Sequence, residues 1–325
     1  MQTTTMFAPS AAAMQSYRMR PVTSAVEWGE YFHALPQAHL MQSYPYGEAK
    51  RAAERLHVER YVFEQGRTPV AICQVLERRL AGVRVGARIN RGPVFLDSAP
   101  SYGVREGVMK LVRMNWRTGR GGPLLIAPAL PDSEENRTLL RSLGFRCRRE
   151  RGWCSSLIDL GLSEEEIRKR LSSSWRNHLK GAMKSGLELR VSQSDGSYQW
   201  MVERHQENMR AKGFAGPKPD LLLALHAADP NEVQVLQALH QDRPVAGMIL
   251  ARFGHTVEHY VGWFGPEGRK LQSGNYLYWQ AICESKKAGY RWFDVGGYDT
   301  NDKFGHFKMN MRGHEYRLAG EWLGL

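Results

Sequence analysis

The chain has 325 residues, which favours two domains of about 150 residues each over a single hydrophobic core. Its 42% hydrophobic and 24% charged residues are typical of a globular protein, and no apolar run reaches the roughly 20 residues of a membrane span, so no transmembrane helix is expected. The net charge of +12 favours polyanionic partners such as nucleic acid, nucleotide diphosphates or an anionic membrane face.

Residues 1–16, rich in alanine and threonine, are expected to form a disordered tail. They show no charged start followed by an apolar run, so we expect a cytoplasmic location. The cysteines show no CxxC or Cys/His spacing, which predicts reduced, mostly buried thiols and no metal site. These cysteines are Cys73, Cys147, Cys154 and Cys283.

The first half begins with a hairpin pattern. Residues 61–76 predict strand, turn and strand, with an arginine and then a Pro-Val-Ala triplet just after the turn. The elements expected next are a strand at Val83–Asn90, a helix at Tyr102–Arg117 and a strand at Pro123–Pro128. A last helix beginning at Asp132 ends at Gly144 before a final strand, so we expect the first domain to end near Leu160.

A basic joint follows, with 12 Lys or Arg against six Asp or Glu between residues 141 and 190. After a capping box at Ser163–Glu166, a helix is expected from Ser174 to about Ser185. Arg176, Lys180 and Lys184 fall on one face of it, four residues apart, where like charges repel. The stripe predicts either an anionic ligand lying across it or a solvated helix face in a basic linker.

The second half repeats the pattern of the first. Residues 233–250 form another hairpin with Arg and then Pro-Val-Ala after the turn. A strand at Thr256–Phe264, a helix at Gly274–Ala288 and a strand at Arg291–Val295 are expected next. Antiparallel hairpins followed by one helix and one strand predict mixed α/β sheets in the order of the acetyltransferase (GNAT) plan.

The chain resembles the Fem-type peptidoglycan-bridge aminoacyl transferases over about residues 40–312, with no long heptad-patterned insertion. The motifs that carry the resemblance are Gln42-Ser43 with Lys50, Arg91-Gly92-Pro93, Ile126-Ala127-Pro128, Trp175–Gly186, Phe293–Gly297 and Phe307-Lys308. The resemblance implies two tandem GNAT-like domains without a coiled-coil arm and a channel between them. The expected divisions are 17–160, 161–303 and a segment 304–325 that returns to the core.

Members of that family attach amino acids from aminoacyl-tRNA to the peptide stem of a cell-wall precursor, and related branches act on antibiotic peptides or use other acyl donors. The resemblance therefore implies an aminoacyltransferase without a cofactor, with an aminoacyl-tRNA donor, a peptide or UDP-linked peptide acceptor, and peripheral membrane contact. An acyl-CoA-dependent GNAT enzyme is the first alternative, although neither Gly268–Asn275 nor Ala99–Gly103 has the usual pyrophosphate loop. A non-catalytic RNA- or nucleotide-binding protein is the second.

Aminolysis of an ester requires a donor for the developing oxyanion. Lys308, which matches the Phe-Lys pair of the family together with Phe307, is the candidate, and a surface lysine on a strand is the alternative. Asp294 ends an apolar strand, where it could orient the amine or accept a proton, or instead cap the turn or pair with Arg291 or Lys308. His306 has an intrinsic pKa suited to proton transfer.

Substrate binding is assigned to residues near these motifs. Lys50 matches the lysine that holds the diphosphate of a UDP-linked precursor, and a solvated helix lysine is the alternative. Arg91 begins one of the motifs and Tyr298 directly follows another, and Lys212 competes with other cations around Gly213–Gly216 for a second phosphate. Arg176, Lys180 and Lys184 are the expected tRNA contacts.

Overall fold

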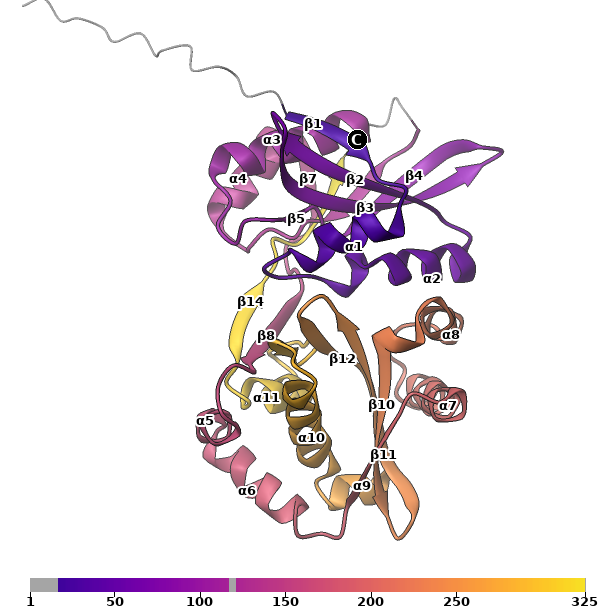
Figure 1. Ribbon diagram of the computed structural model, residues 1–325, viewed down its shortest axis with the longest axis vertical. Helices are drawn as coiled ribbons and strands as arrows, with labels where there is room; N and C mark the ends of the chain where they lie inside the picture. Colours follow the sequence, from indigo (N-terminus) through magenta and orange to yellow (C-terminus); the bar gives the residue numbers. More distant parts are fainter. Residues whose placement is uncertain (1–16, 117–120, 325) are drawn as a thin grey trace, which may run out of the picture.

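The computed structural model describes residues 17–116 and 121–324, so the tail expected at 1–16 lies outside the described residues. The described residues form two sheets stacked along the long axis of the molecule (Figure 1). None of the helices in this part of the chain is long and apolar enough to cross a bilayer.

The first sheet has the strand order β1-β2-β3-β4-β6-β15-β7, with β5 paired to β3. Its strands are β1 (Tyr17–Pro21), β2 (His57–Gln65), β3 (Thr68–Leu80), β4 (Val83–Asn90), β5 (Val94–Phe95), β6 (Leu124–Ala127), β7 (Phe145–Arg149) and β15 (Glu321–Gly324). The helices of this half are α1 (Ala25–His33), η1 (Leu40–Gln42), α2 (Tyr44–Glu54), α3 (Tyr102–Asn115) and α4 (Glu134–Ser142).

The second sheet has the order β14-β8-β13-β12-β11-β10-β9. Its strands are β8 (Cys154–Asp159), β9 (Glu188–Ser192), β10 (Val233–His240), β11 (Arg243–Phe253), β12 (Thr256–Phe264), β13 (Trp292–Asp294) and β14 (His314–Arg317). The helices are α5 (Glu164–Arg170), α6 (Ser173–Ala182), α7 (Asp195–Lys212), α8 (Pro219–Ala228), η3 (Pro230–Glu232), α9 (Pro266–Lys270), α10 (Ser273–Lys287) and α11 (Lys303–Met309).

Serine begins most of the longer helices. At each of these N-termini the serine hydroxyl accepts the backbone N–H three residues ahead, which satisfies a group that the helix leaves unpaired. The capping serines are Ser24, Ser43, Ser101, Ser133, Ser163, Ser172 and Ser194. The predicted capping box at Ser163 is confirmed, because Glu166 also accepts the Ser163 N–H.

The repeat seen in the sequence is present in the strand register. In the first hairpin Phe63 faces Ala71 before the register shifts, and in the second Ala238 faces Ala246 before the same shift. In both, the valine of Pro-Val-Ala is the extra residue of a β-bulge. The predicted mixed α/β class is confirmed, with β4 parallel to β6 and β12 parallel to β13.

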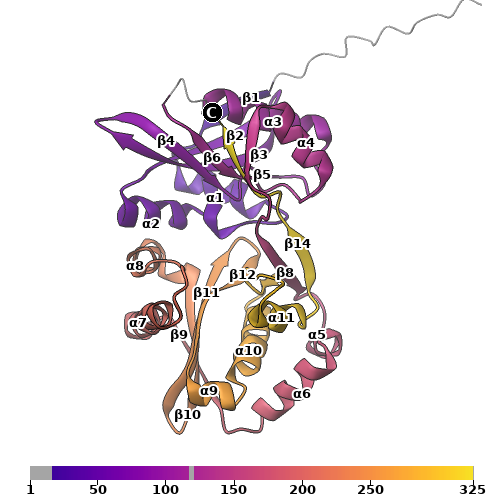
Figure 2. The same ribbon diagram turned by 180° about the vertical axis from the view of Figure 1, so that it is seen from behind.

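The two halves share a helical layer. One hydrophobic cluster contains Trp28 and Phe32 of α1 together with Met201 of α7 and Leu222 of α8. Both views show α2 and α8 facing each other between the sheets (Figures 1 and 2). The outer faces have separate cores, formed with α3 and α4 on one sheet and with α6 and α10 on the other. Because the middle layer is common, burial of apolar surface fixes the halves against each other.

The chain crosses between the sheets twice. The strand expected after Gly144 is β7 of the first sheet, whereas residues 154–159 lie in the second sheet, where Ile158 pairs with Phe293. The change of sheet therefore falls at residues 150–153, before the boundary proposed at 160. The returning segment 304–325 contributes to both sheets: β14 pairs with β8 (Figure 1), and β15 lies between β6 and β7.

Candidate active site

The candidate site lies where two parallel strands separate. β12 and β13 pair only as far as Glu258 and Asp294, after which the chain turns away through Gly296 and Gly297. Gly296 has a φ of 77°, and a Cβ there would lie 2.2 Å from the His259 carbonyl oxygen, so only glycine fits. Because the strands have separated, the backbone carbonyls of Gly296 and Gly297 have no strand partner and need hydrogen-bond donors from elsewhere.

Lys308 supplies these donors from α11. Its Nζ donates to the carbonyls of Gly296 at 3.1 Å and Gly297 at 3.0 Å. The side chain is only 2% exposed, and the ammonium lies 4.7 Å from the centre of the Phe304 ring. Lys308 is therefore a buried helical residue, which differs from the surface lysine on a strand that the sequence left as the alternative.

Burial lowers the pKa of Lys308 to about 8, although Asp294 and Glu258 oppose this change. An ammonium has three N–H donors, and the two glycine carbonyls take two of them. The third has no described acceptor. The site thus holds one partly desolvated N–H donor at a turn next to the domain interface.

Asp294 is held by three donors. It accepts the N–H of Gly296 at 2.8 Å, the hydroxyl of Tyr316 at 2.7 Å and the hydroxyl of Ser155. Arg291, one of the partners considered from sequence, pairs instead with Asp159. The aspartate therefore caps the turn that presents the glycine carbonyls to Lys308.

Glu258 is a site residue that the sequence analysis missed. It faces Asp294 across β12 and β13, is 2% exposed, and burial raises its pKa to about 7. Among the described residues it forms one ion pair, with Arg91, whose Nη1 lies 3.5 Å from its carboxylate. The available signal was a single acidic residue in a strand made mostly of apolar and aromatic residues.

Arg91 reaches this cluster from the first half of the chain. It follows β4 with a φ of 47°, and its guanidinium carbon lies 3.5 Å from the centre of the Trp153 ring. Burial lowers the pKa of His39 to about 3, and the Arg91 charge contributes to that shift. Arg91 thus joins the two halves at the site, with its charge balanced by Glu258.

An open cleft of about 800 Å³ is lined by both halves of the chain and meets the cluster at Arg91 and Gly297, whereas the buried Lys308 and Glu258 are not among its lining residues. Gly297, Tyr298 and Trp153 form part of its wall, and Tyr298 bonds Ser156 at 2.6 Å and Glu315 at 3.1 Å. The cleft is also lined by six arginines, Arg88, Arg91, Arg137, Arg149, Arg151 and Arg317, against the four acids Asp132, Glu150, Asp299 and Glu321. Five of these arginines pair with the carboxylates of Glu321, Glu258, Asp132, Asp299 and Glu315, and Arg149 has no ion pair among the described residues. Arg149 is therefore the lining cation most available to an anionic ligand.

Other residues expected at the site lie elsewhere. Lys50 is in α2, paired with Glu54 at 2.5 Å, and does not line the cleft. His306 is exposed on α11. Lys212 is largely exposed at the end of α7, and its partial desolvation and the nearby charge of Arg269 lower its pKa. Phe307 packs into the aromatic core, 5.2 Å from Tyr278 and 5.8 Å from Trp175 between ring centres.

The basic stripe on α6 is interrupted. Lys180 and Lys184 are exposed, but Arg176 is half-buried and donates to the carbonyls of Lys169 and Leu171. These carbonyls end helix α5, so the Arg176 guanidinium satisfies groups that the helix leaves unpaired. Two of the three predicted cations are therefore available to a ligand.

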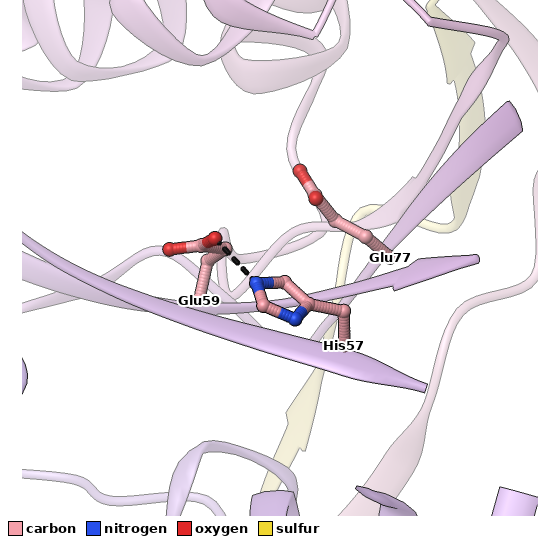
Figure 3. A group of neighbouring side chains, drawn as sticks. All are labelled: His57, Glu59 and Glu77. Carbon is pink, nitrogen blue, oxygen red and sulfur yellow. Dashed lines mark hydrogen bonds and ion pairs between the residues drawn. The ribbon is translucent and has the colours of Figure 1, made fainter. Parts of the chain in front are cut away.

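Figure 3 shows His57, Glu59 and Glu77, whose ligand atoms lie close enough together to hold a metal ion. Their charges are already compensated within the protein. Arg79 pairs with both glutamates, at 3.0 Å and 2.7 Å, and Arg84 pairs with Glu77 at 3.3 Å. The cluster is accounted for by these ion pairs, without surplus negative charge for a cation.

The thiols differ in part from the prediction. All four cysteines are free, but only Cys73 is buried, while Cys147 is exposed and Cys154 and Cys283 are half-buried. Burial raises the pKa of Cys283 to about 12, which disfavours a reactive thiolate there.

Comparison with known proteins supports this architecture. Residues 167–309 match the family model described as an acetyltransferase (GNAT) domain. The structure is similar to a crystal structure of FemX, with a TM-score of 0.76, 11% identity, and coverage of 95% of this chain and 97% of that one. No match was found among the curated proteins.

Two further solved structures share the fold. A tandem GNAT protein from the clavulanic acid biosynthesis pathway aligns with a TM-score of 0.54 and 10% identity, covering 95% of this chain and 98% of that one. The C-terminal domain of a putative lysylphosphatidylglycerol synthetase from Agrobacterium fabrum aligns with a TM-score of 0.56 and 15% identity, covering 92% and 91%. The chain therefore has the Fem-type tandem GNAT fold that its motifs predicted.

Proposed function

We propose that the protein is an acyltransferase that moves an aminoacyl group from an aminoacyl-tRNA onto an amine of a peptide acceptor. The observation that carries this proposal is the buried Lys308 ammonium, held at a glycine turn beside an arginine-lined cleft between the two halves. A cell-wall precursor or a peptide natural product is the acceptor class, and a cytoplasmic location, where charged tRNA is found, is part of the proposal.

In the proposed reaction the acceptor amine attacks the ester carbonyl carbon that links the amino acid to the tRNA ribose. A carbon–nitrogen bond forms, and negative charge develops on the carbonyl oxygen. The third N–H of Lys308 stabilises this oxyanion, since its other two donors are fixed by Gly296 and Gly297. The carbon–oxygen bond to the ribose then breaks and leaves an amide.

Glu258 is the proposed proton acceptor. Its pKa of about 7 lets it take the proton that the attacking amine loses and return it to the ribose oxygen as that group leaves. Arg91 holds the carboxylate from the opposite half, and Asp294 keeps the turn in place through its three hydrogen bonds. The charges of Lys308 and Arg91 balance those of Glu258 and Asp294.

The arginine-lined cleft is the proposed acceptor site. Guanidinium groups bind phosphate oxygens in pairs, so the diphosphate of a UDP-linked peptide would bind Arg149 and displace carboxylates from neighbouring arginines of the cleft. Tyr298, next to the glycine turn, would orient the part of the acceptor that approaches Lys308. On the other side of the second sheet, Lys180 and Lys184 are the proposed contacts for tRNA phosphates.

An acyl-CoA donor is the second candidate, and one observation favours it. Helix α10 begins at Gln272 without a side-chain cap, and the Ser273 hydroxyl and Asn275 amide are buried without hydrogen-bond partners among the described residues. A free helix N-terminus with unpaired polar groups can bind phosphate. The phosphate could belong to CoA or to the 3′ end of a tRNA.

A transfer assay separates the two donors. The purified protein is given a labelled amino acid, tRNA, the matching synthetase and a peptide acceptor, with and without RNase, and in parallel an acyl-CoA without tRNA. The proposal predicts labelled acceptor only when intact tRNA is present. Acylation by RNase-treated protein supplied with acyl-CoA alone would replace the tRNA proposal with the CoA one.

A further inference from the structure

The β3–β4 hairpin exposes apolar side chains at its tip. Leu80, Val83 and Val85 are 71%, 64% and 42% exposed, whereas Ala87 and Ile89 further along β4 are buried. The hairpin projects from the edge of the first half of the molecule (Figure 1). Three exposed aliphatic side chains within six residues differ from the single exposed apolar residues that are normal on a protein surface.

The turn itself is apolar. Ala81 and Gly82 have φ values of 48° and 79°, the left-handed conformations of a two-residue hairpin turn. Asparagine or aspartate usually occupies the first of these positions, because alanine is strained there. The chain therefore carries an apolar residue at a turn where local backbone preference favours a polar one.

Positive charge surrounds this tip. Residues 77–88 contain four arginines and one glutamate, a local charge of +3. Arg79 and Arg84 hold Glu77 and Arg88 pairs with Glu321, while Arg78 is exposed close to Leu80 in the sequence. A small apolar tip with a basic collar matches an anionic bilayer surface, where aliphatic groups enter the interface and arginines meet lipid phosphates.

We propose that the β3–β4 hairpin is a peripheral membrane-binding element that inserts Leu80, Val83 and Val85 into the interface of an anionic phospholipid bilayer. This role goes beyond the proposed acyl transfer and depends only on the hairpin. Charge complementarity selects a bilayer over an apolar protein surface, because the exposed Arg78 next to the tip would lack an anionic partner against an apolar face.

The position of the hairpin places the cleft close to such a surface. Arg88, five residues from Val83 on the same strand, lines the cleft, and a strand rises about 3.3 Å per residue, so the two are about 16 Å apart. A protein docked through the tip would hold its cleft within reach of an acceptor that projects from the bilayer.

The test is co-flotation of the full-length protein with vesicles of phosphatidylcholine alone or mixed with phosphatidylglycerol. We expect binding to the anionic vesicles, a loss of about tenfold or more for the double variant Leu80→Ser/Val83→Ser, and a loss of about fivefold for Arg78→Gln. The matched control Val26→Ser, which changes a valine that is 74% exposed on α1, should bind like the wild type.

Three results would overturn the proposal: wild-type protein that does not float with anionic vesicles, a double variant that floats as well as wild type, or a double variant that differs only by losing a dimer in sedimentation. Near-identical melting temperatures of all variants show that the fold is intact. Since the assay contains no tRNA or acceptor, its failure leaves the proposed acyl transfer to be judged by the transfer assay alone.

Discussion

Replacing Lys308 by methionine removes the proposed oxyanion donor and keeps an unbranched side chain of similar length. Removal of one such donor typically costs about 100- to 1000-fold in kcat, or about 3–4 kcal/mol. We therefore expect kcat of the methionine variant to fall at least about 100-fold, with a smaller change in KM, because the donor acts on charge that develops only in the transition state.

Two opposing effects act on the free energy of unfolding of this variant. A pKa lowered from 10.5 to about 8 corresponds to about 3 kcal/mol of penalty on the buried ammonium, which the substitution removes. Against this, the carbonyls of Gly296 and Gly297 lose their donor, at about 1–3 kcal/mol for each buried group. The two carbonyls together cost about 2–6 kcal/mol against the roughly 3 kcal/mol gained, so the free energy of unfolding should change by no more than about 3 kcal/mol.

Steady-state kinetics measure the loss in kcat, and urea unfolding measures the change in the free energy of unfolding. The control in both is Lys303→Met, which changes an exposed lysine on the same helix. The control should keep wild-type activity. If Lys308→Met kept more than about a tenth of the wild-type kcat, Lys308 would not be the oxyanion donor. If the variant unfolded, the main role of the Lys308 contacts would be to stabilise the fold.

The remaining predictions use the same assays. Activity should rise with pH as Glu258 ionises near its pKa of about 7 and fall as Lys308 deprotonates near about 8; a pH–rate profile without a narrow bell would contradict this. Glu258→Gln should lower kcat by about 100-fold and move the alkaline limb to lower pH, because the carboxylate helps to keep Lys308 protonated. Arg91→Gln should move the acid limb of the pH–rate profile to higher pH, since the Arg91 charge lowers the pKa of Glu258. An unchanged acid limb would argue against the ion pair between Arg91 and Glu258. The double variant Lys180→Glu/Lys184→Glu should weaken the binding of all tRNAs alike and reduce the salt dependence of that binding. A loss of binding that depends on the tRNA sequence would contradict the proposed phosphate contacts.

Much of the fold followed from local pattern. The strands predicted at Val83–Asn90 and Thr256–Phe264 have the observed bounds, because turn residues mark their ends and the hairpins pair near neighbours. The strands that the end of the chain adds to both sheets could not be located so well. Four-residue strands such as Glu321–Gly324 carry too little pattern, and their pairing depends on contacts far along the chain.

The candidate site was predictable in part. Lys308 and Asp294 stood out through their motifs, but the burial that lowers the pKa of Lys308 depends on tertiary packing. Glu258 was missed because both faces of its strand are covered, so the strand has no polar face on which an acid would be expected. The spacing of Arg176 indicated a free basic stripe, yet its guanidinium holds the end of the preceding helix.

Single-turnover transfer from a preformed, labelled aminoacyl-tRNA to a peptide acceptor tests the central claim most directly. An ester is cleaved by mild alkali and an amide is not, so alkali-stable label on the acceptor counts the bonds formed. We predict stable label with wild-type protein and with Lys303→Met, and at least about 100-fold slower transfer with Lys308→Met. Label that stays on the tRNA or appears only as free amino acid with wild-type protein, while an acyl-CoA acylates the same acceptor, would contradict the account.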